Sequence, residues 1–114
     1  MASCSDNSQS AQTIIDQMAN DMKSQLPKLL DKDTKLVNVY TTKMGIVSEY
    51  ELLNFEFTEE NKAAAETKIE FYLKSQVCPS IKQELLSKGV FSKYVYKGKD
   101  GQYLFDKVLK QGDC

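Results

Sequence analysis

The stretch VFSKYVYKGKDGQYLFDKVLK, residues 90–110, decides the fold. Residues 90–97 and 102–110 are rich in β-branched and aromatic side chains, which favour extended strands. The four residues GKDG between them, 98–101, supply the glycines that a tight turn requires. This pattern predicts an antiparallel hairpin close to the C-terminal end of the chain.

A second hairpin is predicted upstream, over residues 36–57. LVNVYTTK at 36–43 has the composition of a strand, and MGI at 44–46 places Gly45 in a turn. VSEYELLNFEF at 47–57 is expected to form the returning strand. Its alternation changes phase near Leu52 and Leu53, which predicts a bulge or a bend there.

The N-terminal part of the chain predicts an amphipathic helix from Ser10 to about Leu30. Its apolar residues recur at three- and four-residue spacing, which makes one stripe suited to covering a sheet. We expect Pro27 to loosen the last turn. The stripe consists of Ile14, Ile15, Met18, Met22, Leu26, Leu29 and Leu30.

A central helix is predicted after Thr58, a residue that favours the N-cap position. ENKAAAETKIEFYLKSQV at 60–77 contains strong helix formers. Pro79 is expected to interrupt this helix after Cys78, and a second piece at 80–89 ends at Gly89.

The predicted order of elements is helix, strand, strand, helix, strand, strand. Because consecutive hairpins favour antiparallel pairing, we expect an α+β fold, with a single four-stranded antiparallel sheet packed by the N-terminal helix and the broken central helix. Residues 10–114 would form this one domain, and the small polar residues 1–9 a flexible tether. In element order the chain resembles the cystatin-like α+β roll. The inhibitory QxVxG loop of cystatins is replaced here by TTKMGIV at 41–47.

Composition narrows the function. All 15 basic residues are lysine, the formal net charge is -1, and the sequence has no histidine, arginine or tryptophan. Histidine is the commonest general base and metal ligand, and arginine supplies the forked contacts that nucleic-acid binding proteins use. We therefore expect no enzyme activity, no cofactor and no nucleic-acid partner. The carboxylates of EENKAAAE at 59–66 fit the first turn of a helix rather than a metal site, so no metal is expected either.

Cys78 and Cys114 are predicted to form a structural disulfide. The bond would close a loop of about 37 residues, which the chain-entropy account values at roughly 4 kcal/mol. The alternatives are a redox pair and two free thiols. A structural disulfide implies an oxidising compartment.

Cys4 has a different expected role. Ala-Ser-Cys at 2–4 resembles the last positions of a bacterial lipobox, in which the cysteine is lipidated. This resemblance to small bacterial lipoproteins implies a palmitate-type lipid anchor on Cys4, and Ser5 resembles the residue that sorts such proteins to the outer membrane, facing the periplasm. The alternative is a vector-derived Met-Ala-Ser before a chance cysteine.

These observations predict a lipid-anchored, monomeric envelope protein that binds another envelope protein without catalysis, in a blocking, adaptor or assembly role. The alternative is a secreted or periplasmic inhibitor of a protease or another envelope enzyme. Tyr94, Tyr96 and Leu104 are the candidate partner-binding residues, on the sheet face turned away from the helices. The alternative interpretation is that these rings merely cover the outer side of the sheet.

Overall fold

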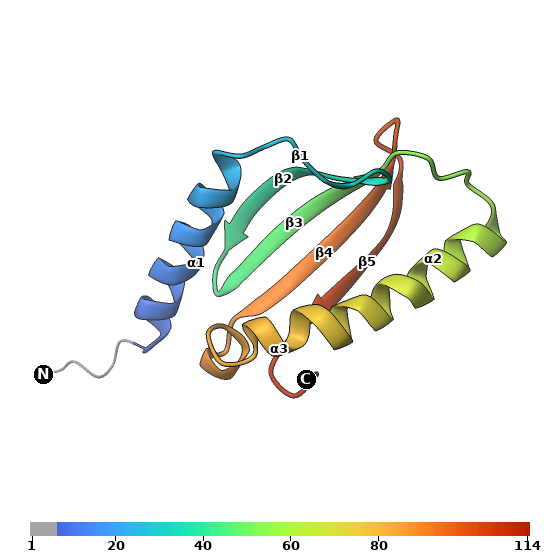
Figure 1. The fold of residues 1–114 in the computed structure, drawn as a ribbon. Helices are drawn as coiled ribbons and strands as arrows, with labels where there is room; N and C mark the ends of the chain where they lie inside the picture. The colour runs from blue at the N-terminus through green and yellow to red at the C-terminus, as the bar shows by residue number, and fades with distance from the viewer. Residues whose placement is uncertain (1–6) are drawn as a thin grey trace, which may run out of the picture.

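The computed structural model describes residues 7–114, and within them one sheet of five strands carries the helices on one face (Figure 1). The strands follow one another across the sheet in chain order. They are β1 (Lys28–Asp31), β2 (Thr34–Thr42), β3 (Gly45–Leu52), β4 (Phe91–Gly98) and β5 (Tyr103–Leu109). The helices are α1 (Asn7–Lys23), α2 (Glu59–Tyr72) and α3 (Cys78–Ile81), with a π-helical turn at Leu73–Val77 and a 3-10 turn at Leu86–Lys88.

The predicted α+β class and both hairpins are confirmed. β2 pairs with β3 and β4 with β5, each antiparallel. The expectation of a purely antiparallel sheet is wrong, because β3 and β4 run parallel. The reason is that α2 and α3 carry the chain back from the end of β3 to the start of β4 before the second hairpin begins.

The expected count of four strands is also wrong, since β1 pairs with β2 at the edge of the sheet. Residues 28–30 of this strand fall within the helix that the sequence predicts. α1 ends at Lys23, before Pro27, and the chain continues as an edge strand. Leu29 and Leu30 match helical spacing, yet their side chains are 59% and 48% exposed.

The phase change near Leu52 and Leu53 marks the end of β3, where a turn at residues 53–54 provides the predicted bend, and no bulge lies within a longer strand. The register irregularity lies in β2 instead, between Leu36 and Asn38. Downstream of β3, residues 53–57 form a connection that leads to α2.

α1 covers β2 and β3, as its apolar stripe predicts. Ala11, Ile15 and Ala19 repeat every fourth residue and are buried against Leu36 and Val39.

Gln12 of the same helix holds the turn between β2 and β3. Its Oε1 accepts the Met44 backbone N–H at 2.7 Å, and its Nε2 donates to the Thr42 carbonyl at 3.2 Å. Met44 has the left-handed φ of 59°, so these bonds fix a conformation that a non-glycine residue seldom adopts.

α2 packs on the sheet through partly buried side chains only. Thr58 caps it as predicted, accepting the Asn61 backbone N–H at 3.0 Å. No residue of α2 itself is buried, and Glu66 joins it to the sheet through Lys107 of β5 at 3.1 Å. Pro79 does not interrupt the helical path as expected. It lies in the first turn of α3, where proline is tolerated because the hydrogen bonds within that helix do not need its backbone N–H.

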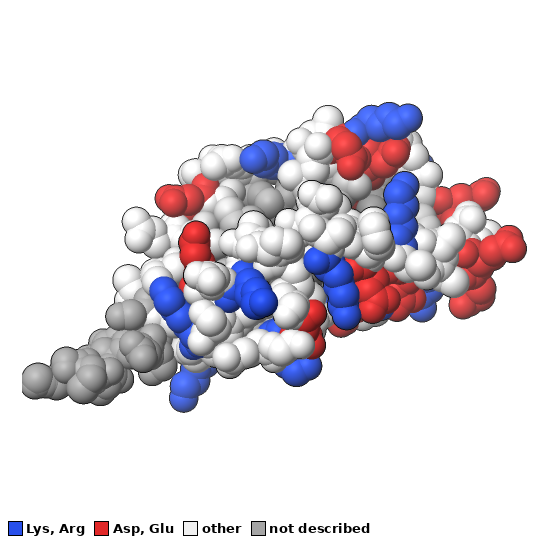
Figure 2. Space-filling model, turned by 60° about the horizontal axis from the view of Figure 1, so that its bottom comes forward, with Lys and Arg blue, Asp and Glu red and all other residues white. Residues whose placement is uncertain are grey.

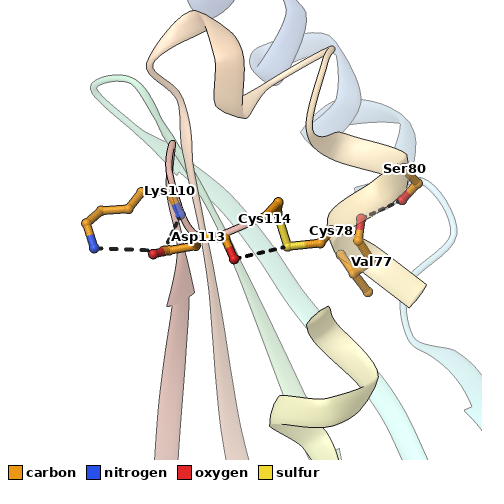
Figure 3. The surroundings of a disulfide bond; sticks show 6 residues. All are labelled: Val77, Cys78, Ser80, Lys110, Asp113 and Cys114. Carbon is orange, nitrogen blue, oxygen red and sulfur yellow. Dashed lines mark hydrogen bonds and ion pairs between the residues drawn. A yellow bond between two sulfur atoms is a disulfide. The ribbon is translucent and has the colours of Figure 1, made fainter. Parts of the chain in front are cut away.

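The structure contains the predicted Cys78–Cys114 disulfide, with the two Cα atoms 5.5 Å apart (Figure 3). Cys78 is buried at the start of α3, whereas Cys114 lies at the exposed end of the chain. Asp113 folds the tail back, because its carboxylate accepts the Lys110 backbone N–H at 2.9 Å. The bond therefore ties the end of the last hairpin to the helical segment beside the sheet.

Candidate functional site

A groove of about 690 Å³ lies on the helix-bearing side of the sheet, between α2 and the β1–β2 edge. The middle of the sheet forms its floor, and the helix and the edge strand form its two walls. Most of the side chains that line it are apolar or aromatic. The lining residues are Leu30, Asp31, Asp33, Thr34, Tyr50, Leu52, Asn54, Phe55, Ala65, Lys68, Ile69, Tyr72, Leu73, Val77, Tyr94 and Tyr96.

Three tyrosines form the floor of the groove. Strand register places Tyr50 beside Tyr96, and their rings stack with centroids 5.0 Å apart and planes 15° apart. Tyr94 stacks on Tyr50 at 6.3 Å, and Phe105 of β5 supports Tyr96 from the far side at 5.3 Å. The floor is thus a row of stacked aromatic rings held by three neighbouring strands.

The floor is also uncharged. Burial away from water raises the pKa of Tyr50, Tyr94 and Tyr96 above the ordinary tyrosine value, and the neighbouring phenols raise that of Tyr50 and Tyr96 further. These phenols stay protonated at neutral pH and are poor proton donors. The arrangement is suited to contact with apolar groups rather than to acid–base chemistry.

The two walls differ in construction. On one side α2 presents Ile69 and Tyr72, and the Tyr72 side chain is 52% exposed at the rim. On the other side, the β1–β2 connection is braced by the loop after β3. Asn54 Nδ2 donates to the Asp33 carboxylate at 2.7 Å, and the Leu53 backbone N–H donates to the Asp33 carbonyl at 2.8 Å.

Charge is distributed unevenly around the molecule. In Figure 2 acidic groups gather at the right, at the end where α2 begins. Glu59 and Glu60 lie in the first turn of this helix, where the helix dipole stabilises negative charge. Among residues 7–114, no group of three or more His, Cys, Asp or Glu side chains is placed to hold a metal ion.

The structure places the predicted binding residues differently from the expectation. Tyr94, Tyr96 and Leu104 are only 6%, 5% and 3% exposed and lie in the core cluster that packs on the helices. The idea of an outer patch is therefore wrong, and so is the idea that these rings cover the outer side of the sheet. Tyr94 and Tyr96 line the groove, whereas Leu104 does not. Their role in binding a partner stays a prediction.

Tyr50, Ile69 and Tyr72 also line the groove, and none of them was predicted to bind a partner. The helical spacing of Ile69 and Tyr72 predicts that both lie on the inner face of the central helix, but that pattern indicates packing on the sheet rather than binding. The place of Tyr50 in the groove was not predictable, because its position depends on the pairing of β3 with β4. Cys4, the predicted lipidation site, lies outside the described residues. No helix among the described residues is long and apolar enough to span a membrane.

The fold is one that solved pilotin structures share. No protein-family model matches the chain, and no curated protein matches it. The type II secretion pilotin EpsS of Vibrio vulnificus matches with a TM-score of 0.73 at 12% identity, over 96% of this chain and 96% of that one. The pilotin AspS of Vibrio cholerae matches with a TM-score of 0.69 at 12% identity, over 99% and 100% of the two chains.

A third structure, a Pseudomonas aeruginosa protein thought to be secreted, matches with a TM-score of 0.72 at 14% identity, over 100% of this chain and 99% of that one. These three matches give no support to the resemblance to cystatins in element order. At such low identities the likeness establishes a common fold over the whole length of the chain.

Proposed function

We propose that this chain is a non-catalytic binding protein of the bacterial cell envelope that assists the assembly of a secretion channel, as a pilotin does. The single observation that carries this proposal is the groove floored by stacked tyrosines, in a fold shared with two type II secretion pilotins. The partner would be a channel subunit of the secretin type, held through an apolar segment.

The construction of the groove supports binding over catalysis. Its aromatic floor is rigid and uncharged, and apolar side chains at both rims, Leu30 and Tyr72, remain about half exposed. Exposed apolar groups next to a hollow typically mark a surface that a partner covers. The alternative of an inhibitor with a free plugging loop is less well supported, because Gln12 clamps the 41–47 turn to α1.

The groove can be tested with the Ile69→Arg variant. The guanidinium would have to lie over the aromatic floor, so we expect co-purification with the secretin subunit of the host to fall at least tenfold. Tyr72→Ala, at an exposed rim position, should weaken capture with little effect on folding. Thr67→Arg is the matched control, since Thr67 is exposed on α2 and outside the groove lining. Capture by Ile69→Arg at the parent level would contradict the proposal.

The lipid anchor is the second part of the proposal. We expect Cys4 to carry the acyl chains that hold the domain at the outer membrane, on the periplasmic side, as a monomer. A Cys78–Cys114 disulfide is compatible with that oxidising compartment. Mass spectrometry of protein taken from its native host should find the acyl increment on Cys4, and the Cys4→Ser variant should leave the membrane fraction. An unmodified native Cys4 thiol would contradict the anchor and leave the groove unaffected.

A further inference from the structure

The groove has opposite charges on its two walls. Asp31 at the end of β1 and Asp33 in the connection to β2 line one wall, and Lys68 of α2 lines the other. Among residues 7–114, none of these three side chains takes part in an ion pair within 4.0 Å. Their charges are therefore available to a molecule that occupies the groove.

The two carboxylates are also held in fixed positions. Asp31 Oδ1 accepts the Asp33 backbone N–H at 2.7 Å, and Asp33 Oδ1 accepts Asn54 Nδ2 at 2.7 Å. Hydrogen bonds from neutral donors leave the negative charge in place while they restrict the side chain. The acidic wall is thus preorganised, which lowers the entropy cost of binding to it.

The helical layer over the sheet is incomplete at this point. α1 covers one buried cluster and the segment from α2 to α3 covers another, and Tyr50 packs against both yet stays only half-buried. One more helix laid on the tyrosine floor would complete the layer, with its apolar stripe inward and its two flanks towards the opposite walls.

We propose that the groove binds an amphipathic helix of a partner protein whose apolar stripe has basic residues on one flank and acidic residues on the other. The basic flank meets Asp31 and Asp33, and the acidic flank meets Lys68. A helix with one sign of charge on both flanks would be repelled by one wall. Because reversing a helix exchanges its flanks, the charges also select the direction in which a given segment lies. This inference rests on the proposed function of the groove.

The test uses three synthetic peptides of about 18 residues with the same leucine stripe. The first has lysine on one flank and glutamate on the other, the second lysine on both, and the third glutamate on both. Affinities are measured by fluorescence anisotropy at low and at high salt. We expect the mixed peptide to bind about fivefold tighter than the other two at low salt, and this preference to disappear at high salt, since exposed charge pairs are weak and screened.

Variants of the protein assign the preference to the walls. Lys68→Glu should make the two-lysine peptide the tightest binder, whereas Lys62→Glu, outside the groove lining, should change nothing. Asp31→Asn with Asp33→Asn keeps the hydrogen-bond acceptors and should remove the discrimination against the two-glutamate peptide. Asp100→Asn is the matched control, because Asp100 Oδ1 accepts the Gln102 backbone N–H at 3.2 Å in the β4–β5 turn and does not line the groove.

Three results would overturn the inference. The first is that all three peptides bind the parent protein equally and that Ile69→Arg abolishes this binding. The second is that the parent prefers the mixed peptide and that Lys68→Glu does not alter this preference. Either one would leave the proposed function of the groove intact. The third is binding that survives Ile69→Arg, or no binding by any peptide, and it would overturn both the charge pattern and the groove as the binding site.

Discussion

The Cys114→Ser variant is expected to melt about 15 °C below the parent protein in oxidising buffer. The disulfide joins residues separated by 36 positions, and the loop it closes is worth about 4 kcal/mol in the chain-entropy account. That is a large part of the 5–15 kcal/mol typical of a small domain. Serine at the exposed position 114 adds no burial cost, and the thiol left at Cys78 is tolerated in apolar surroundings.

Reducing agent provides the control for this experiment. It should lower the melting temperature of the parent to that of Cys114→Ser and leave the variant unchanged, because only the parent has a bond to lose. Calorimetry in both buffers measures the difference. The same comparison separates a structural disulfide from the two alternatives, since free thiols or a readily reversed redox pair would add little stability. Equal melting temperatures in oxidising buffer would contradict the pairing as a source of stability.

The disulfide also bears on the groove. Cys78 directly follows the π-helical turn Leu73–Val77. The first and last residues of this turn, Leu73 and Val77, both line the groove. No residue of α2 is buried, whereas Leu73 directly after it is. The helical wall of the groove is therefore anchored to the sheet at the C-terminal end of α2. We therefore expect the loss of stability in Cys114→Ser to be accompanied by weaker partner capture.

The parts of the fold that local patterns determine were predictable from sequence. The glycine-flanked turn gives the β4–β5 hairpin, and a capping threonine gives the start of α2. The β2–β3 hairpin was also predicted, but its turn consists of Lys43 and Met44, and Gly45 is the first residue of β3 rather than a turn residue. The parallel pairing of β3 with β4 was not predictable, because it depends on the route of the helical connection between two complete hairpins. β1 was missed since Leu29 and Leu30 continue the helical spacing of α1, and periodicity alone does not show that the helix stops before Pro27.

The site was less predictable than the fold for a related reason. Alternation along β4 separates Tyr94 and Tyr96 from Phe91 and Val95, but it does not say which set faces the helices. Only the register that aligns Tyr50 with Tyr96 reveals an aromatic floor. The cysteines were predictable as a pair because their chemistry allows few alternatives. The groove, by contrast, is formed by side chains from four strands, α2, the π-helical turn and two connections, which come together only in the folded chain.

Above pH 10 the domain is expected to lose stability steeply, and the tyrosines of the groove floor are the reason. Burial raises the pKa of Tyr50 and Tyr96 in the folded protein above the value of 10.0 that applies to an unfolded chain. The unfolded state therefore releases these protons first. The stabilising contribution is fully present below pH 10 and is lost as the pH rises towards the folded pKa values. For two such groups the loss is roughly 2.7 kcal/mol per pH unit, or about 5 kcal/mol at pH 12.

Circular dichroism and phenolate absorbance, followed together across this pH range, test the prediction. In the parent protein the phenolate signal of the buried tyrosines should appear only with loss of structure. The Tyr50→Phe, Tyr96→Phe double variant keeps the stacked rings and lacks two hydroxyls, so it should stay folded to a higher pH. Tyr40→Phe, at an exposed position on β2, should unfold like the parent. If all six tyrosines titrated near pH 10 in protein that remains folded, the floor of the groove would be open to water and could not exclude it beneath a bound helix.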